Sequence, residues 1–211
     1  MHNIVDLTLT YTNSFTGFKK EVSKTVEKDG WNATNLNFYS HCGTHMDAPI
    51  HFNVSSQTID QIPVSNFIGK TWIIDVKDVG PKGLIFPKHI PQNILDQFSA
   101  GDSLVFWTGW SKHVNTPAYR DDLPRISEEL AHWCVSHTVK MIGVEPPSVA
   151  DVNNIEEVTK IHQILLASVI IIEGLTNLES LQSNCVELIA LPLKIESGDG
   201  SPARVISIEK Y

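Results

Sequence analysis

The sequence predicts an α/β fold, mixed α+β in character, that is built on a mixed sheet. Short runs of apolar and β-branched residues recur along the chain between turn residues, which is typical of buried strands. Only two or three segments have the apolar spacing of amphipathic helices. No repeat, low-complexity stretch or linker divides the 211 residues, which are enough for a substantial core. We therefore expect a single domain over residues 1–211.

The first half of the chain is expected to consist mainly of strands. Five segments rich in apolar residues are interpreted as strands or strand arms, and they cover residues 3–9, 22–26, 31–39, 69–79 and 102–108. Residues 22–26 are interpreted as one arm of a hairpin. Pro81, Pro87 and Pro91 interrupt the chain between the last two strands, and residues 92–98 are expected to form a short helix.

The second half combines two helices with four more strands. Ser127 is the expected N-cap of a helix that reaches about His137, because Glu128 and Glu129 in the first turn suit the positive end of the helix dipole. A second, amphipathic helix is expected over residues 155–167. The other apolar runs predict strands over residues 139–144, 169–172, 186–195 and 203–208, with a turn or loop over residues 197–202.

The composition excludes several classes of protein. A formal charge of −8, without any run of Lys or Arg, disfavours nucleic acid and anionic membranes as partners. The start of the sequence lacks the features of a secretory signal, and the longest apolar run, residues 164–172, is about half as long as a membrane helix requires. We therefore expect a cytoplasmic protein. Cys42, Cys134 and Cys185 are odd in number and far apart, which argues against disulfides or a cysteine zinc site.

Residues 41–51 form the densest cluster of metal-binding side chains in the sequence and hold three of its nine histidines. Imidazole and carboxylate groups are the ligands that Zn²⁺, Mn²⁺ and Fe²⁺ take from proteins. His41, His45 and Asp47 are therefore predicted to bind one metal ion as a facial set.

The same segment is a poor helix interior, although His at i and i+4 also fits one face of a helix. Gly43 tolerates a positive φ at little cost, and Pro49 fixes φ at the end of the run. We expect a loop or a short turn that leaves the strand over residues 31–39. Two alternatives remain open: Cys42 has the chemistry of a further ligand, and the histidines could be unrelated surface residues around a turn.

Three further residues complete the candidate site. His51 lies beyond the stiffened turn, so we expect it to act as general base and proton shuttle, with orientation of a ligand as the alternative. Glu173 follows three isoleucines, and a carboxylate at the end of a buried strand needs a partner. That partner could be a metal shared with His162 on the preceding helix, or the pair could be a surface carboxylate and a packing histidine.

The pattern His41-x-Gly43-Thr44-His45-x-Asp47-x-Pro49-x-His51 resembles the signature of the cyclase family of metal-dependent hydrolases, which includes bacterial kynurenine formamidases and isatin hydrolases. The resemblance extends to Thr108-Gly109-Trp110, to the turn Gly143-Val144-Glu145-Pro146-Pro147-Ser148, and to His162 followed by Glu173. It implies the swivelling β/β/α fold. It also implies that His162 and Glu173 bind a second metal, and that the chain forms homodimers or tetramers in which a neighbour lines the pocket.

We therefore expect a metal-dependent hydrolase that acts on C–N bonds other than peptide bonds. A metal-activated water would open an amide, lactam or lactone bond in a small aromatic or cyclic substrate, as in arylformamidases and isatin hydrolases. The expected cofactor is zinc or manganese, with two ions per chain and Asp47 able to bridge them. Two alternatives remain: a noncatalytic metal-binding or ligand-binding protein of the same fold, and an iron oxygenase that uses only His41, His45 and Asp47.

Overall fold

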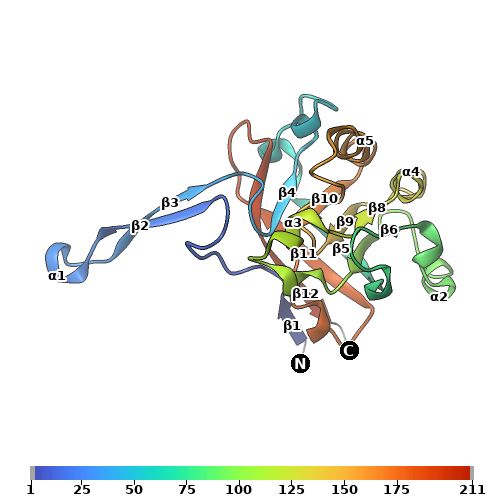
Figure 1. Ribbon diagram of the computed structural model, residues 1–211, viewed down its shortest axis with the longest axis horizontal. Coiled ribbons are helices and arrows are strands. Elements are labelled where there is room, and N and C mark those ends of the chain that lie inside the picture. Colours follow the sequence, from blue (N-terminus) through green and yellow to red (C-terminus); the bar gives the residue numbers. More distant parts are fainter. Residues whose placement is uncertain (1–2, 210–211) are drawn as a thin grey trace.

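Seven strands close into a barrel within residues 3–209, the part of the chain that this computed structural model describes (Figure 1). Around the barrel they are β12 (Gly200–Glu209), β11 (Cys185–Pro192), β5 (Ile68–Asp75), β7 (Ser103–Trp107), β9 (Met141–Val144), β10 (Ile170–Glu173) and β4 (His45–Asp47). The barrel closes because β4 pairs with both β10 and β12. A further strand, β1 (Asn3–Asp6), pairs antiparallel with β12.

The direction of the strands confirms the mixed sheet predicted from the sequence. Three neighbouring pairs are parallel: β5 with β7, β7 with β9, and β9 with β10. The other pairs of the barrel are antiparallel. Parallel neighbours need long crossover connections. These connections carry the helices α2 (Gln92–Leu95), α3 (Pro117–Asp121), α4 (Glu128–Ser136) and α5 (Ile155–Leu166).

The two longer helices begin where the sequence predicted. The Ser127 hydroxyl accepts a hydrogen bond from the backbone N–H of Leu130 and so caps α4. The side chain of Asn154 caps α5 in the same way, through the N–H of Glu157. Since α5 connects β9 to β10, these three elements form one βαβ unit.

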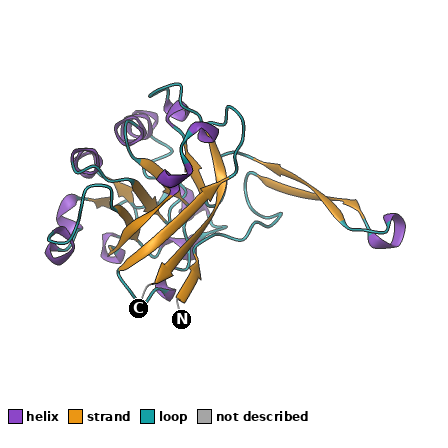
Figure 2. Cartoon of the chain, turned by 180° about the vertical axis from the view of Figure 1, so that it is seen from behind, coloured by secondary structure: helices purple, strands orange, loops and turns teal. Residues whose placement is uncertain are grey.

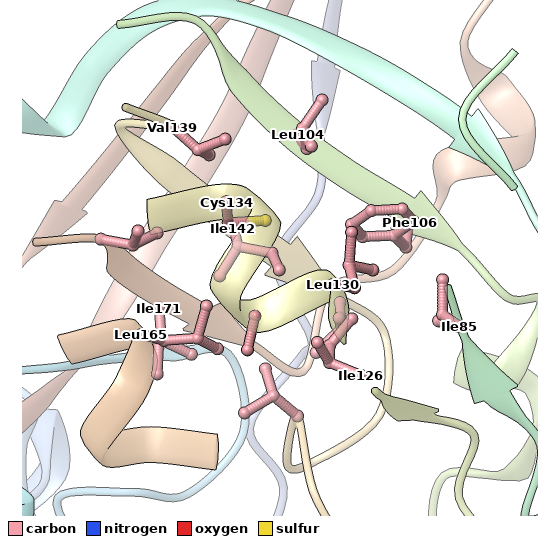
Figure 3. Close-up of a cluster of buried hydrophobic side chains, with 14 of the residues drawn as sticks. Ile85, Leu104, Phe106, Ile126, Leu130, Cys134, Val139, Ile142, Leu165 and Ile171 are labelled. Atoms are coloured by element: carbon pink, nitrogen blue, oxygen red, sulfur yellow. The ribbon is translucent and has the colours of Figure 1, made fainter. Parts of the chain in front are cut away.

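Side chains on the two faces of the barrel wall belong to two different hydrophobic clusters. Ile73 and Ile172 lie in the barrel interior, whereas Ile74 and Ile171 pack outward beneath the helices. Figure 3 shows this outer cluster, in which Leu130 and Cys134 of α4 and Leu165 of α5 meet the strands. Because both faces are covered there, β9 and residues 170–172 of β10 are apolar at successive positions and do not alternate with polar residues.

A two-stranded arm extends away from the barrel (Figures 1 and 2). It consists of β2 (Phe18–Lys24) and β3 (Ala33–Phe38), with the one-turn helix α1 (Val26–Asp29) at its tip. The hairpin arm predicted at residues 22–26 is confirmed for residues 22–24, whereas Val26 begins α1. The strand predicted at residues 31–39 also forms, but it belongs to this arm and not to the barrel.

Several short elements were not predicted, because two to five residues give too little periodicity to detect. They comprise α1, α3, the paired strands β6 (Leu84–Ile85) and β8 (Arg125–Ile126), and the 3₁₀ helices η1 (Pro49–Phe52), η2 (Ile59–Gln61), η3 (Val64–Phe67), η4 (Lys77–Val79), η5 (Pro87–His89), η6 (Trp110–His113) and η7 (Leu178–Ser180). Conversely, the strand predicted at residues 3–9 ends at Asp6. No helix within residues 3–209 has the length and apolar character that crossing a membrane requires.

Candidate metal centre

Three of the five candidate ligands, His45, Asp47 and Glu173, lie on the outer face of two neighbouring barrel strands. Met46 on β4 is paired with Ile172 on β10, and both side chains fill the barrel interior. The adjacent pair, His45 and Glu173, must therefore face the opposite way, because successive side chains alternate along a strand. That outer face is covered by α5, and Asp47 shares it with His45.

The expectation of a loop or turn at the ligand run is wrong for residues 45–47. His45, Met46 and Asp47 form strand β4, whose pairing on both edges is set by β10 and β12 rather than by its own sequence. Three residues carry no detectable strand period, so only the completed sheet decides their conformation. No α-helix forms over residues 41–51, in agreement with the prediction: residues 45–47 are a strand, and the 3₁₀ helix η1 follows it.

Gly43 adopts the positive φ predicted for it, with a value of 65°. It also lies against the ring of Tyr11, where an added Cβ would approach the ring to 2.7 Å. The Tyr11 hydroxyl donates to the carbonyl oxygens of Cys42 and Thr44 on either side of this glycine. Tyr11 therefore holds the turn that joins His41 to β4.

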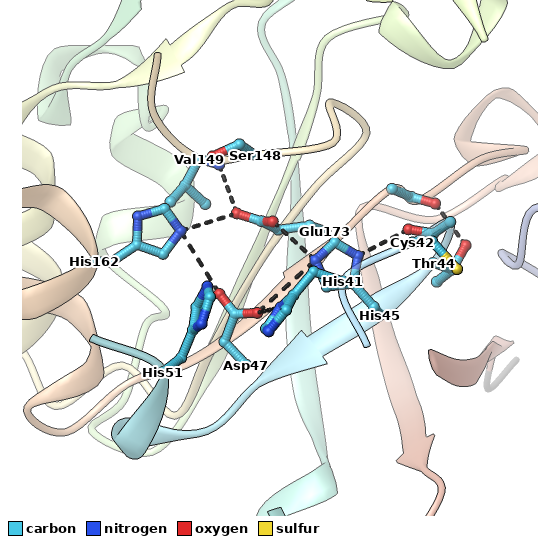
Figure 4. A network of polar contacts seen from close by, with 12 residues as sticks. His41, Cys42, Thr44, His45, Asp47, His51, Ser148, Val149, His162 and Glu173 are labelled. Atoms are coloured by element: carbon cyan, nitrogen blue, oxygen red, sulfur yellow. Dashed lines mark hydrogen bonds and ion pairs between the residues drawn. The ribbon is translucent and has the colours of Figure 1, made fainter. Parts of the chain in front are cut away.

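Five side chains point toward one another in Figure 4. Asp47 Oδ1 lies 2.8 Å from His41 Nδ1 and 3.8 Å from His45 Nε2. Its other oxygen, Oδ2, lies 3.6 Å from His162 Nε2. Glu173 contacts both of the buried histidines, with Oε2 3.1 Å from His45 Nε2 and Oε1 3.4 Å from His162 Nε2. The structure thus brings together all five residues predicted as metal ligands.

The tautomers of two histidines leave lone pairs aimed at the carboxylates. The Nδ1 proton of His45 is donated to the carbonyl oxygen of Gly43 over 2.9 Å, and that of His162 to Val158 over 2.7 Å. In the neutral form each Nε2 then carries a lone pair, not a proton. These lone pairs converge with the oxygens of Asp47 and Glu173, an arrangement that is repulsive unless a positive charge lies between them.

The surroundings of Asp47 Oδ2 show whether a metal ion would fit between these side chains. This oxygen is buried and has no hydrogen-bond partner, which is costly for a carboxylate. The donor atoms fall into two groups, one of His41, His45 and Asp47 and the other of Asp47, His162 and Glu173, and within each group they lie within 4.8 Å of one another. Asp47 belongs to both groups. Nitrogen and oxygen donors arranged in this way fit divalent metal ions.

The electrostatics of the cluster also favour positive charge. Burial alone would lower the pKa of His41, but the neighbouring carboxylates of Asp47 and Asp199 outweigh it and raise this pKa to about 9. Burial alone would raise the pKa of Asp47, yet the three surrounding imidazoles hold it below its usual range. The pKa of His162 is raised, because the carboxylates of Glu173 and Asp47 outweigh its burial. The carboxylates thus favour positive charge in this cluster.

His51 lies beside these ligands, but its ring nitrogens do not converge with theirs on Asp47. It sits on η1, and its ring stacks on that of His41 with 3.8 Å between the ring centroids and 19° between the planes. Its side chain is partly exposed and lines the main cavity. The pKa of His51 is lowered, chiefly because burial disfavours the imidazolium. A neutral imidazole at the edge of the cavity is free to exchange a proton with a bound molecule.

The cavity in front of the cluster has a volume of about 650 Å³. His41, His45, His162 and Glu173 form part of its lining, together with aromatic side chains that come from several separate segments, Phe15, Tyr39, Phe52 and Tyr119. A volume of this size and a largely apolar wall suit a small organic ligand.

The remaining sequence candidates lie outside the cluster. Cys42 is buried, and within residues 3–209 no metal-binding group includes a cysteine. The three cysteines are free, as predicted. His132 is exposed beside Glu128, and His137 stacks on Trp133, so neither histidine reaches the site.

Sequence reasoning missed two residues near the site. Asp199 lies in the loop before β12, and its carboxylate is 3.1 Å from His41 Nε2. Its position between two glycines was the available signal, but nothing in the sequence placed that loop beside residue 41. Tyr119, on the unpredicted helix α3, is buried at the cavity wall and donates to the carbonyl oxygen of Glu145.

Glu145 itself has a structural role and does not line the cavity. Its Oε2 atom accepts hydrogen bonds from the backbone N–H groups of Thr108, Gly109 and Trp110 and from the Thr108 hydroxyl. The side chain is fully buried. It fixes the turn that follows β7 and leads to α3.

A closed mixed barrel with three histidines and two carboxylates gathered beside its wall defines an α/β protein with a candidate metal centre. The chain belongs to the cyclase family, whose sequence model, described as "Putative cyclase", matches residues 5–151. The mixed α/β fold predicted from the sequence is confirmed.

Similar proteins support the same assignment. The chain is 33% identical to kynurenine formamidase of Bacillus cytotoxicus over 192 residues, which cover 90% of this chain and 87% of the relative. Its structure matches isatin hydrolase A of Labrenzia aggregata with a TM-score of 0.89 and 24% identity, over 100% of this chain and 94% of the other. A structure from Bacillus stearothermophilus, described as a predicted metal-dependent hydrolase, matches with a TM-score of 0.79 and 22% identity over the full length of both chains.

Proposed function

We propose that this protein is a metal-dependent hydrolase that opens an amide, lactam or lactone bond in a small aromatic or cyclic molecule. The observation that carries the proposal is the convergence of the Nε2 lone pairs of His45 and His162 with the carboxylates of Asp47 and Glu173. A buried site of this kind needs a cation for its stability.

The relatives support a reaction at a C–N bond outside peptides. The relative that is 33% identical over 90% of this chain is named kynurenine formamidase, and the fold is that of a solved isatin hydrolase. Arylformamide and cyclic amide substrates share a carbonyl carbon bonded to nitrogen next to an aromatic ring. We therefore place the substrate of this chain in that class.

In this proposal His41, His45 and Asp47 would hold one ion, and His162 and Glu173 would hold a second ion together with Asp47. When bound, such ions supply a Lewis acid that polarises a carbonyl group and lowers the pKa of a water molecule to near 7. Nitrogen and oxygen donors favour zinc or manganese, and two donor groups favour two ions per chain.

His51 is the proposed general base and proton shuttle. Its neutral imidazole borders the cavity, stacks on His41 and lies outside the facing ligand atoms. It can take the proton of the attacking water and return it to the leaving nitrogen when the C–N bond breaks. The hydrolysis then balances, with the hydroxyl on the acyl carbon and the proton on the amine.

The geometry disfavours the two alternative functions. An iron oxygenase would use only one carboxylate and two histidines, whereas here His162 and Glu173 complete a second donor group around Asp47. A protein that only binds a ligand has no need for a neutral imidazole stacked beside the metal site. Placement in the cytoplasm stays a prediction of the sequence.

The deciding experiment joins metal analysis to a substrate screen. Protein purified without chelator is analysed for its metal content and then tested on an aryl formamide, on isatin and on an aromatic lactone. We expect zinc or manganese to be present and at least one substrate to be hydrolysed, with loss of turnover on chelation and recovery on adding metal. Full hydrolysis by the metal-free protein would refute the proposal.

The projecting arm favours a homo-oligomer. Its apolar side chains are exposed, at 74% for Val22, 59% for Trp31 and 55% for Leu36. A lone two-stranded hairpin is at best marginally stable in water, so it gains from being covered. We propose that a second copy of this chain covers the arm, giving a dimer or tetramer.

Light scattering measures the mass of the particle and tests this assembly. The double substitution Val22→Glu and Leu36→Glu should shift the mass toward that of a monomer. Val64→Glu, a change of an equally exposed valine on η3, is the control and should keep the wild-type mass. A monomeric wild-type protein would contradict the proposed assembly.

A further inference from the structure

Each of the three candidate histidine ligands has one ring nitrogen that points away from Asp47 and Glu173. The hydrogen-bond partner of this nitrogen differs among the three. In His45 and His162 the nitrogen that points away from the carboxylates donates to a backbone carbonyl, of Gly43 and Val158 respectively. In His41 the corresponding atom is Nε2, and it faces the side chain of Asp199 at 3.1 Å. His41 is thus the one ligand of these three whose orientation depends on a side chain.

The loop that carries Asp199 is built to lie close to His41. Gly200 follows it, and a Cβ at that position would meet His41 Cε1 at 2.5 Å and the carbonyl oxygen of Met46 at 2.7 Å. The backbone of the loop is tied to the end of β4, because the N–H of Ala48 donates to the carbonyl oxygen of Asp199 over 2.9 Å. The imidazole of His41 therefore packs directly on this loop.

Asp199 also lies within ion-pair distance of His51, whose ring stacks on that of His41. Its Oδ2 atom is 3.8 Å from His51 Nδ1, while the rings of His41 and His51 are parallel to within 19°. One carboxylate thus faces both rings from one side. It is half-exposed, with 50% of its side chain accessible, so its effect is expected to be smaller than that of a buried carboxylate.

We propose that Asp199 is a positioning residue for the metal centre: it accepts the Nε2 proton of His41, so that Nδ1, on the side of Asp47, is the nitrogen left to bind metal. The inference rests on the proposed metal-dependent function. A carboxylate behind a histidine ligand fixes the tautomer, orients the ring and makes the ligand nitrogen more basic. Loss of such a partner usually lowers metal affinity about 10- to 100-fold.

The test measures the affinity of the full-length protein for Zn²⁺ in competition with a chromophoric chelator. Asp199→Asn and Asp199→Ala are compared with Glu196→Gln, which removes a charge from an exposed position of the same loop, three residues before Asp199. We expect both Asp199 variants to bind Zn²⁺ about tenfold or more weakly, and Glu196→Gln to bind like the wild type. The melting temperature of the chelator-treated proteins shows whether the fold is kept.

A second measurement separates positioning from a loss of structure. In the Zn²⁺-loaded wild type, the Nε2 proton of His41 should exchange slowly with solvent by nuclear magnetic resonance, and this protection should disappear in Asp199→Ala. Unchanged affinity in both Asp199 variants, or an equal loss in Glu196→Gln, would overturn the proposal. Failure of the wild-type protein to bind Zn²⁺ or Mn²⁺ would instead contradict the proposed function itself.

Discussion

Glu173 on β10 and His45 on β4 are directly opposite each other across two antiparallel strands, and Glu173 Oε2 lies 3.1 Å from His45 Nε2. His45 donates its other ring proton to Gly43, so the nitrogen facing Glu173 is the one with the lone pair. Strand pairing thus forces two electron-rich groups together inside the protein. The stability of the folded chain should therefore depend on metal.

Metal should stabilise the wild-type protein and not the variants that lack a ligand. Adding Zn²⁺ to chelator-treated protein should raise its melting temperature, since saturation at about 100 times the dissociation constant contributes about 2.7 kcal/mol. His45→Ala and Asp47→Ala should lose this increase together with turnover. Calorimetry checks the first effect, and His132→Ala, at an exposed histidine, is the control. Full metal content and activity in either ligand variant would exclude this site.

The second donor group should hold its own ion. Metal-saturated wild-type protein is expected to approach two ions per chain, and His162→Ala or Glu173→Gln should reduce this to one, because His41 and His45 still hold the first ion. Mass spectrometry of metal content after gel filtration measures the ratio. One ion in the wild type, with no change in either variant, would show a mononuclear site.

His51→Ala should lower kcat about 10²- to 10⁴-fold while metal content stays near normal, because a proton shuttle acts on the barrier without holding the ion. Burial holds the pKa of His51 below its usual value of 6.5, so the neutral base persists down to this lowered pKa and is lost as pH falls through it. Wild-type activity should therefore fall on the acid side. Metal content measured at each pH excludes ligand protonation as the cause, and a parallel loss of metal in His51→Ala would make His51 a ligand.

Glu145→Ala should destabilise the fold. The substitution leaves the buried N–H groups that follow β7 without an acceptor, at a cost on the order of 3 kcal/mol or more. Urea unfolding at pH 7 measures the free energy of unfolding, with Glu196→Ala on an exposed loop as the matched control. A change within about 0.5 kcal/mol, the usual range for a surface site, would show that these hydrogen bonds contribute little.

Glu209 should make stability depend on pH. Its carboxylate accepts the N–H groups of Gln182 and Ser183 and the amide of Asn3. Burial alone would raise the pKa of Glu209, but these hydrogen bonds outweigh it and hold the pKa below 4.5. A depressed folded-state pKa stabilises the fold above the unfolded value and loses this effect as pH falls through the folded value.

Glu209→Gln should therefore be less stable than the wild type at pH 7, by on the order of 1 kcal/mol, with a smaller difference below pH of about 4. Denaturant unfolding at a series of pH values follows the difference. A gap of constant size from pH 7 to pH 3 would mean that the charge of Glu209 plays no part in it.

The sequence by itself determined the chemistry and most of the regular structure. Apolar runs identified most of the barrel strands, and Ser127 marked the start of α4 because its hydroxyl can satisfy a free N–H group. The density of His41, His45 and Asp47 in one short segment indicated metal binding, since imidazole and carboxylate groups are the usual protein ligands of divalent metals. Information of this kind is local, so it survives without coordinates.

The tertiary structure decided what depends on residues far apart in the chain. Strand β4 exists because β10 and β12 pair with both of its edges, and its pairing turns His45 and Asp47 toward α5 and His162. Asp199 reaches His41 across 158 positions of sequence. The local sequence of either segment cannot predict that contact. Pairing across a closed sheet is determined by the packing of all its strands together.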